Sequence, residues 1–396
     1  MRTLVLTLEY PNRASYYEDW RDAFLAEPRF GAVVANVFSP EGRAAALRAL
    51  READLAVVLH ACTADSLDHI HPLETALAER RCQLVSFVGN EVNLPWSPLG
   101  PKIDWLKRVR PDVVATQLLL EAGEYLYGDC GARIIALPHA LNPQAFIART
   151  PQSARPIDIG ARSFRYLAYI GDDDRNRIYD FFATRRFDPP LALDFSTERR
   201  FDRAGWAAFL DRCKATIATE AGSWFLERDD ATVTAIRAWA AGRTKGLVIR
   251  ADSPMRRFAQ RLPYPLKALL RRLLRKGPLR HEALAAEDLD ASEVHARFFA
   301  GRDRAPVYSK CISSRHFDAM GTKTAQIMFP GRYSDILRPG EHYIELAADF
   351  ANIDDVLRRL RDAEWRRAMV ERAHALAMGG HTYRHRLEAL AKTLAI

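Results

Sequence analysis

Cysteine is scarce in this sequence, and the few that occur form no pattern. There are five, an odd number, and no two are spaced as Cys-x-x-Cys. This argues against a disulfide framework and against a zinc site, because both need paired or closely spaced thiols. We therefore expect reduced core thiols in a cytoplasmic protein at Cys62, Cys82, Cys130, Cys213 and Cys311.

Long apolar runs are also absent. Arg2 is the only charge before the first apolar run, LVLTL, which has the length of a strand and not that of a signal-peptide core. No stretch approaches the roughly 20 apolar residues that a membrane-spanning helix needs. The sequence shows no internal repeat and no low-complexity tract, and its 396 residues predict two globular domains.

An excess of positive charge is confined to one segment. The net charge is +8, and residues 251–280 hold nine Lys or Arg and one acid, Asp252. Removing these from the totals of 58 basic and 50 acidic residues leaves 49 of each in the rest of the chain. A nucleic-acid binder is expected to show a broader basic face with interleaved aromatics. Leucines are interleaved here, so no nucleic-acid partner is expected.

What the sequence does contain is an alternation of apolar runs and helical segments. Over residues 1–145 the runs are almost continuously apolar, which is typical of a parallel sheet covered by helices on both faces. Ligands of such sheets bind beyond the carboxyl ends of the strands. The polar residues that follow expected strands there are His60, Asn90, Glu91 and His139.

A second α/β unit follows a linker. The linker, residues 146–160, lies in a stretch with three prolines and little periodicity. The second unit, 161–379, is expected to open with a strand at 164–171, FRYLAYIG. The alternation is lost from about 225 to 305, which predicts a helical insertion that carries the basic segment. One helix at 352–377 and another at 381–395 are expected to close the chain.

Four motifs, in this order along the chain, carry a resemblance to a known enzyme class. They are PHALNPQAF, YIGDDDRNRIYDFF, an acid-Ala-x-Gly pattern at 318–321 followed by TAQIMF and Gly331, and RPGEHYIEL. Together they resemble GT-B glycosyltransferases related to retaining family 4 and to the spore-coat-maturation-like (CgeB-like) group. The resemblance covers most of the chain. It implies two Rossmann-like domains, with the last helix, 380–396, crossing back to the first domain.

The resemblance also implies a function. A GT-B enzyme of this kind transfers a sugar from a nucleotide-sugar donor to a glycan or lipid-linked acceptor, here in bacterial surface polysaccharide or glycoconjugate synthesis. It implies a retaining enzyme that needs no metal or other cofactor. Two alternatives stay open: a catalytically inactive GT-B protein that serves assembly at the membrane, and a GT-B nucleotide-sugar epimerase.

The resemblance assigns donor contacts to the segment SSRHFDAMGTKT. Asp318 takes the role of binding the donor ribose, with a plain helix-start acid as the alternative. Helix-start amides and nearby cations stabilise phosphates. The residues expected near the diphosphate are Arg315, His316, Gly321, Thr322, Lys323 and Thr324, of which Lys323 is equally well explained as a solvated lysine.

One position departs from the family pattern. Family 4 enzymes usually show two glutamates eight residues apart, whereas here the second is Asp318 and the position eight before it is Lys310. Our hypothesis is that Glu220, in TEAGS, takes the role of the first acid. This substitution is also what keeps the inactive-protein alternative open.

The run GDDDRNR, which begins at Gly171, allows two interpretations. Three adjacent acids are typical of a Mg²⁺ or Mn²⁺ site. The alternative, which we favour, is that the acids cap a helix and that Arg175, and next Arg177, contact the donor phosphates without a metal.

Two residues of the first unit are candidates for catalysis. His60 follows the third strand, and the resemblance places a histidine near the donor sugar; a buried core histidine is the alternative. Glu91 is a candidate to orient the acceptor hydroxyl, or equally a helix cap. A retaining enzyme needs no strong base, whereas an inverting one would use Glu91 or His60.

The basic segment contains an amphipathic pattern, PLKALLRRLLRK. Its leucines fall on one face and its cations on the other, which is the pattern of a helix lying on anionic lipid at the inner face of the cell membrane. A helix docked on the protein through its leucines is the alternative. The candidate membrane contacts are Leu266, Leu269, Leu270, Arg271, Arg272, Leu273 and Arg275.

Overall fold

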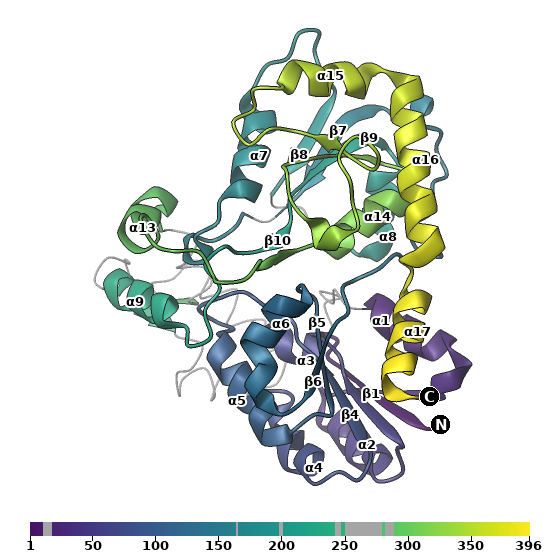
Figure 1. The fold of residues 1–396 in the computed structure, drawn as a ribbon, viewed down its shortest axis with the longest axis vertical. Helices are drawn as coiled ribbons and strands as arrows, with labels where there is room; N and C mark the ends of the chain where they lie inside the picture. Colours follow the sequence, from purple (N-terminus) through teal and green to yellow (C-terminus); the bar gives the residue numbers. More distant parts are fainter. Residues whose placement is uncertain (11–17, 164, 198–200, 242–246, 250–278, 282–288) are drawn as a thin grey trace.

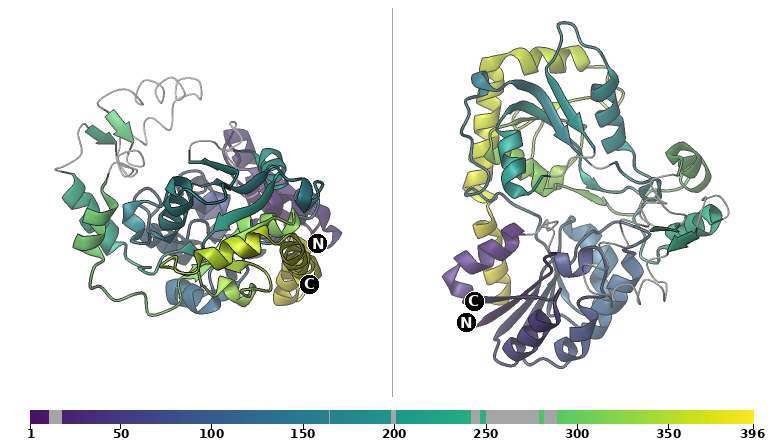
Figure 2. Two further views of the ribbon diagram at one scale, coloured as in Figure 1. Left: turned by 90° about the horizontal axis from the view of Figure 1, so that it is seen from above. Right: turned by 180° about the vertical axis from the view of Figure 1, so that it is seen from behind.

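The computed structural model describes residues 1–10, 18–163, 165–197, 201–241, 247–249, 279–281 and 289–396. These residues form two α/β domains, one above the other in Figure 1. The chain crosses between the domains twice. The two crossings lie side by side, since Leu141 on one and Thr382 on the other form a parallel β-bridge. The two termini lie close together on the first domain (Figures 1 and 2).

The first domain is a six-stranded parallel sheet of order β2-β1-β3-β4-β5-β6. Its strands are β1 (Thr3–Thr7), β2 (Ala32–Asn36), β3 (Leu55–Val58), β4 (Gln83–Phe87), β5 (Val113–Thr116) and β6 (Arg133–Ala136). Its helices are α1 (Glu18–Ala26), α2 (Pro40–Leu50), α3 (Ala61–Ala64), α4 (Glu74–Ala78), α5 (Leu99–Val109) and α6 (Leu120–Tyr127).

Both faces of this sheet are buried, as the near-continuous apolar strands predict. Successive residues of β1 point to opposite faces: Leu4 and Leu6 belong to the same hydrophobic cluster as Trp105 of α5, whereas Val5 belongs to the cluster of Trp20 of α1. The near-continuous apolar runs that identified the strands in the sequence therefore reflect burial of both faces of the sheet.

The second domain is a five-stranded parallel sheet of order β15-β14-β9-β7-β8. Its strands are β7 (Ile157–Arg162), β8 (Leu193–Ser196), β9 (Cys213–Ala218), β14 (Ala325–Met328) and β15 (Ile344–Glu345). Its helices are α7 (Asp174–Thr184), α8 (Arg203–Leu210), α14 (Ser314–Gly321), α15 (Ile353–Arg361) and α16 (Ala363–Gly380).

The last helix, α17 (Tyr383–Leu394), belongs to the core of the first domain. Tyr383, Leu387, Leu390 and Leu394 of α17 pack into the same cluster as Trp20. In Figure 1 α16 runs down the second domain and α17 continues onto the first. The predicted crossover of the last helix is confirmed.

The part of the insertion that the structure describes contains helices and short strands. They are α9 (Ala231–Ala240), β11 (Leu247–Ile249), β12 (Leu279–His281) and α13 (Ala291–Phe298), and the short strands β10 (Ala221–Gly222) and β13 (Lys310–Cys311) flank the insertion. β10 and β13 pair antiparallel, and β11 and β12 pair parallel. The predicted membrane contacts, Leu266 to Arg275, lie outside the described residues. None of the helices in the described part of the chain combines the length and apolar character needed to span a bilayer.

One strand lies earlier than the sequence predicts. The second domain opens with β7 (Ile157–Arg162), of which the first four residues fall in the expected linker. A strand is expected at 164–171, of which the structure describes 165–171. These residues are irregular, with a 3-10 turn at Ala168–Ile170. The stretch is apolar for another reason: Tyr169 packs against Val233 and Ile236 of α9.

One expected helix is two. The helix predicted at 352–377 is interrupted at Asp362, which leaves the helical region with φ −69° and ψ 101°. Its carboxylate accepts a hydrogen bond from the backbone N–H of Trp365 and so caps α16. The boundary between α15 and α16 is therefore marked in the sequence by Asp362, a capping residue within a continuous helical pattern of apolar residues.

Candidate functional site

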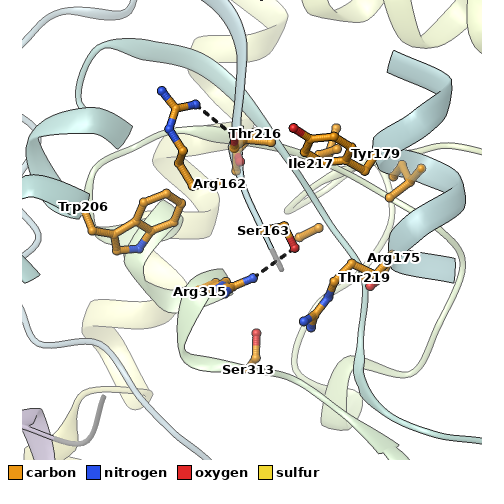
Figure 3. Close-up of a pocket in the computed structure, with 13 residues that line it drawn as sticks. Arg162, Ser163, Arg175, Tyr179, Trp206, Thr216, Ile217, Thr219, Ser313 and Arg315 are labelled. Atoms are coloured by element: carbon orange, nitrogen blue, oxygen red, sulfur yellow. Dashed lines mark hydrogen bonds between the residues drawn. The ribbon is translucent and has the colours of Figure 1, made fainter. Parts of the chain in front are cut away.

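A pocket opens at the carboxyl edge of the second-domain sheet, where ligands of parallel sheets bind (Figure 3). It lies beyond the ends of β7 and β9 and between α7, α8 and α14. Among the described residues that line it are three arginines and no carboxylate. The lining residues are Ala161, Arg162, Ser163, Arg175, Ile178, Tyr179, Trp206, Thr216, Ile217, Ala218, Thr219, Ser313 and Arg315.

Two of the arginines stand at helix starts that face the pocket. Arg175 is the second residue of α7, and Arg315 is the second residue of α14. Their side chains reach toward the pocket from opposite sides (Figure 3). The guanidinium of Arg175 donates to the hydroxyl of Tyr166 at 3.0 Å and lies 3.9 Å from the centre of that ring. The Arg315 Nη1 atom is 3.5 Å from Ser163 Oγ.

The third arginine is held in the fold. Arg162 donates to the carboxylate of Asp194 at 2.6 Å and to its carbonyl at 2.8 Å. Its guanidinium also lies 4.1 Å from the centre of the Phe209 ring. The positive charge presented to a ligand therefore comes mainly from Arg175 and Arg315, together with the amide groups of two helix starts.

His316 organises the start of α14 without lining the pocket. Its Nδ1 atom accepts a hydrogen bond from the backbone N–H of Ser313 at 3.0 Å, and the ring is fully buried. Burial lowers the pKa of His316 to about 3. The ring is thus neutral at physiological pH, so its contribution here is to hold the helix start that carries Arg315.

The acids of the GDDDRNR run meet a buried lysine. Lys310 Nζ lies 2.6 Å from Asp172 Oδ2 and 2.7 Å from Asp174 Oδ2, and only 3 % of the lysine side chain is exposed. Burial acts to lower the pKa of Lys310, but the two carboxylates outweigh it and raise that pKa. Lys310, which stands where this sequence departs from the family pattern, therefore offsets part of the negative charge of these acids.

Gly171 and Arg177 from the same run lie away from the pocket lining. Gly171 has φ +69°, and a Cβ there would come within 2.6 Å of the Phe299 ring, so the position requires glycine for the backbone. Arg177 donates to the carbonyl of Ala348 and lies 5.8 Å from the centre of the Phe350 ring. A phosphate contact by Arg177 stays a prediction that this geometry does not favour.

The two candidate donor acids are buried behind the pocket. Asp318 Oδ2 accepts from the indole N–H of Trp206 at 3.0 Å, and burial raises the pKa of Asp318 well above its usual value. Glu220 accepts from the hydroxyl of Tyr308 and, at 2.7 Å, from the backbone N–H of Tyr333, and burial raises its pKa. Trp206 lines the pocket, so Asp318 is one side chain removed from it. The ribose and sugar roles of these acids stay predictions.

The Gly-Thr-Lys-Thr turn is at the opposite edge of the sheet from the pocket. It leads into β14, and residues that precede a strand of a parallel sheet lie at its amino end, which corrects the expected place beside the diphosphate. A Cβ on Gly321 would come within 2.7 Å of the Phe146 carbonyl, and Lys323 pairs with Glu371 at 2.7 Å. Thr322 and Thr324 hydrogen-bond to each other at 3.0 Å.

The first-domain candidates are buried at the carboxyl edge of their own sheet. The His60 ring stacks on His139 with 5.1 Å between centres, and burial lowers its pKa well below its usual value. Glu91 accepts from Thr116 Oγ1 at 2.6 Å, from the backbone N–H of Gln117 at 2.7 Å and from the Tyr127 hydroxyl at 3.0 Å. The catalytic roles of both residues stay predictions.

Glu91 predicts a pH dependence of stability. Burial raises the pKa of its carboxyl to about 7, well above the ordinary value of a glutamate. Between these values the unfolded state has lost a proton that the folded state keeps, so Glu91 lowers stability progressively as the pH rises. In denaturant titrations we expect the free energy of unfolding of Glu91→Gln, relative to that of the wild type, to be higher at pH 8 than at pH 5. A stability difference that does not change with pH would contradict this.

Sequence reasoning missed most of the pocket. Ser163, Trp206, Thr216 and Thr219 line it but belong to no motif, and Tyr179 lies in the motif YIGDDDRNRIYDFF but was not singled out as a site residue. The rule that ligands bind at the carboxyl ends of strands would have indicated Ser163, had β7 been placed at Ile157–Arg162, and Thr219, had β9 been ended at Ala218. No sequence signal identifies Trp206, because α8 brings it to the pocket through tertiary packing.

Comparisons with known proteins agree on the fold. A family profile described as "Glycosyl transferase-like" matches residues 273–392. No curated protein sequence matches the chain. The structure is similar to that of Anabaena HepE in complex with UDP and glucose, at a TM-score of 0.50 and 11% identity over 100% of this chain and 99% of that one. It is also similar to an alpha-glucosyltransferase in complex with UDP-glucose and DNA containing an abasic site, at a TM-score of 0.51 and 10% identity over 100% of both chains.

Proposed function

We propose that this GT-B protein is a glycosyltransferase that binds a nucleotide-sugar donor in the second-domain pocket. The fold itself, two Rossmann-like domains with parallel sheets, is confirmed by the structure and its neighbours. The observation that carries the proposal is the pocket between the starts of α7 and α14, with Arg175 and Arg315 on its two sides. The match of residues 273–392 to a glycosyl transferase-like profile includes α14, and the sequence resemblance points to family 4 and the spore-coat-maturation-like group.

The chemistry of glycosyl transfer fits this arrangement. When the bond between sugar and nucleotide breaks, negative charge develops on the diphosphate leaving group. Arg175, Arg315 and the amide groups at two helix starts are placed to stabilise that charge. No described residue that lines the pocket is an acid that would oppose it.

The comparisons favour a uridine nucleotide as the first donor to test. The HepE structure holds UDP and glucose, and the alpha-glucosyltransferase structure holds UDP-glucose. Both are distant in sequence, so the sugar and the base are open to experiment on this chain.

The proposed reaction needs no divalent cation. The candidate metal ligands of the acidic run, Asp172 and Asp174, pair with Lys310. Two carboxylates that share a lysine are poor metal ligands, because Mg²⁺ and Mn²⁺ need free carboxylate oxygens. We further propose a retaining reaction, which needs no strong base: both oxygens of Glu91 already accept hydrogen bonds.

Turnover and binding test the proposed function directly. UDP, GDP, CMP, ADP and dTDP with their sugars would be screened by thermal shift, and transfer to glycan or lipid-linked acceptors would then be measured with the donor that binds. Binding with transfer, unchanged by EDTA, is the expected result. Binding with conversion of the donor sugar but no transfer would favour the epimerase, and no binding at all the inactive assembly protein. Activity lost in EDTA and restored by Mn²⁺ would contradict the metal-free proposal.

We propose that the acceptor is carried on a lipid or membrane-associated glycan. The motivation is the amphipathic basic pattern at 265–276, which is typical of a helix on anionic lipid. Wild-type protein is expected to sediment with vesicles containing phosphatidylglycerol but not with phosphatidylcholine alone. Arg271→Glu combined with Arg272→Glu and Arg275→Glu should abolish sedimentation, because the charge attraction reverses. Equal sedimentation of both proteins would favour a helix docked on the protein.

A further inference from the structure

A segment of the insertion joins the two domains on the side opposite the chain crossings. Residues 226–230 lie between β10 and α9, and they contact the first domain at the start of α5. In Figure 1, α9 and α13 lie on one side of the molecule, whereas α16 and α17, where the chain crosses, lie on the other. The domains are thus connected covalently on one side and by side-chain contacts on the other.

The contact completes the start of α5. Pro98, at the N-cap of α5, makes no side-chain capping bond. The carboxylate of Asp230, from the other domain, accepts from the backbone N–H of Leu99 at 3.1 Å and of Gly100 at 2.6 Å. Those are two of the amide groups that a helix start leaves without intrahelical partners, and a carboxylate there is also favoured by the helix dipole.

Asn93 ties the same segment to the loop that follows β4. Its side-chain amide donates to the carbonyl of Glu227 at 3.0 Å and to Asp230 Oδ1 at 2.8 Å, and its Oδ1 accepts from the Glu227 backbone N–H at 3.0 Å. Asn93, Glu227 and Asp230 are all buried. The junction therefore provides hydrogen-bond partners for buried polar groups of both domains. Asn93 would lose its bonds to Glu227 and Asp230 if the domains separated.

The segment is braced from behind. The carboxylate of Glu227 accepts a hydrogen bond from the backbone N–H of Thr232, in α9, at 2.9 Å. It also pairs with Arg302, in the loop that follows α13. These two contacts hold Glu227 in place from within its own domain. Asp230 has φ +55°, a left-handed conformation that is uncommon for a residue other than glycine. A backbone held in this conformation at a contact between domains is consistent with a specific junction.

We propose that residues 226–230 form a releasable interdomain clamp, with Asp230 capping α5 and Asn93 holding Glu227. Leu226 of this segment and Cys311 of β13 are buried in a hydrophobic cluster of the first domain, whereas the cluster around Trp20 and the cluster around Ile327 each lie within one domain. Releasing the clamp therefore exposes these two apolar side chains and unfolds neither domain. Water can take the place of the carboxylate at an exposed helix start, which makes the release reversible. The proposal concerns domain arrangement and goes beyond the proposed function.

Small-angle X-ray scattering of Asp230→Ala tests the clamp. Asp229→Ala is the matched control, because it removes the same charge from an adjacent, exposed residue. A chain of this size has a radius of gyration of roughly 21 Å, and we expect Asp230→Ala to increase it by about 1 Å with a broader distance distribution. The control should superimpose on the wild type, and circular dichroism should show all three proteins folded.

Asn93→Ala gives a second test, since it removes the hydrogen bonds of Asn93 with Glu227 and with Asp230 but leaves the carboxylate of Asp230 to cap α5. It should also expand the molecule, by less than Asp230→Ala. Scattering curves of both variants that match the wild type would overturn the clamp and leave Asp230 as a cap only. Unfolding of both variants would also overturn it, because it would show that the junction is part of a single core and not a releasable contact.

Discussion

Replacing Arg175 and Arg315 together with alanine is expected to weaken binding of a nucleoside diphosphate by about 100-fold or more. A hydrogen bond to a charged group contributes about 1.5–3 kcal/mol, and about 1.4 kcal/mol corresponds to a tenfold change in affinity. Each single variant should therefore lose about tenfold or more. The measurement is isothermal titration with the nucleotide identified by the binding screen.

Arg177→Ala is the matched control for these variants. Arg177 lies on the same helix as Arg175, two residues further on, but it contacts the Ala348 carbonyl and not the pocket. Its replacement should leave nucleotide affinity within about twofold, because surface charges at this distance are screened. An Arg177→Ala variant that loses as much affinity as Arg175→Ala would show that the phosphates bind elsewhere on α7. Unchanged affinity of the double variant would contradict the pocket assignment.

Lys310→Met is expected to lower stability by roughly 3–5 kcal/mol, the cost of leaving buried charges without a partner. Lys310 is the cation that contacts both Asp172 and Asp174, and the side chain of Asp172 is only 2 % exposed. A methionine has similar length but no charge, so two carboxylates would be left side by side at the start of α7. Thermal and denaturant unfolding measure the loss.

Removing the carboxylates tests the cause of that loss. The triple variant Lys310→Met, Asp172→Asn, Asp174→Asn keeps the side-chain volumes but contains no unpaired charge, so it should recover most of the stability of the wild type. An equally large loss in the triple variant would mean that Lys310 matters through packing, for example against the Trp224 ring at 4.8 Å, and not through charge.

The alternation of strands and helices was predictable because both domains bury their sheets on two faces. LVLTL, LAVV and AQIM are almost entirely apolar, with Thr7 and Gln326 as the exceptions, and they correspond to β1, β3 and β14. The crossover of α17 followed from the resemblance. The start of the second domain was not predictable from apolar content, because β7, the strand next to the edge strand β8, contains Asp158, Gly160 and Arg162.

The candidate site was predictable only in part, since it depends on contacts between residues far apart in the sequence. Arg175 and Arg315 were singled out by sequence, and the fold brings them to one pocket. The pairing of Lys310 with Asp172 joins residues on separate elements, and no local pattern indicates it. The turn at 321–324 was misplaced because glycine and threonine suit a tight structural turn as well as a phosphate loop.

Hydrogen exchange with and without the nucleotide that binds most tightly tests the central claim most directly. A donor in the second-domain pocket should slow exchange in the first turns of α7 and α14 and at the end of β7, because these backbone groups face the pocket. Exchange in the turn at 321–324 and around Glu91 should not change. Protection confined to the first-domain edge, or to that turn, would contradict the account.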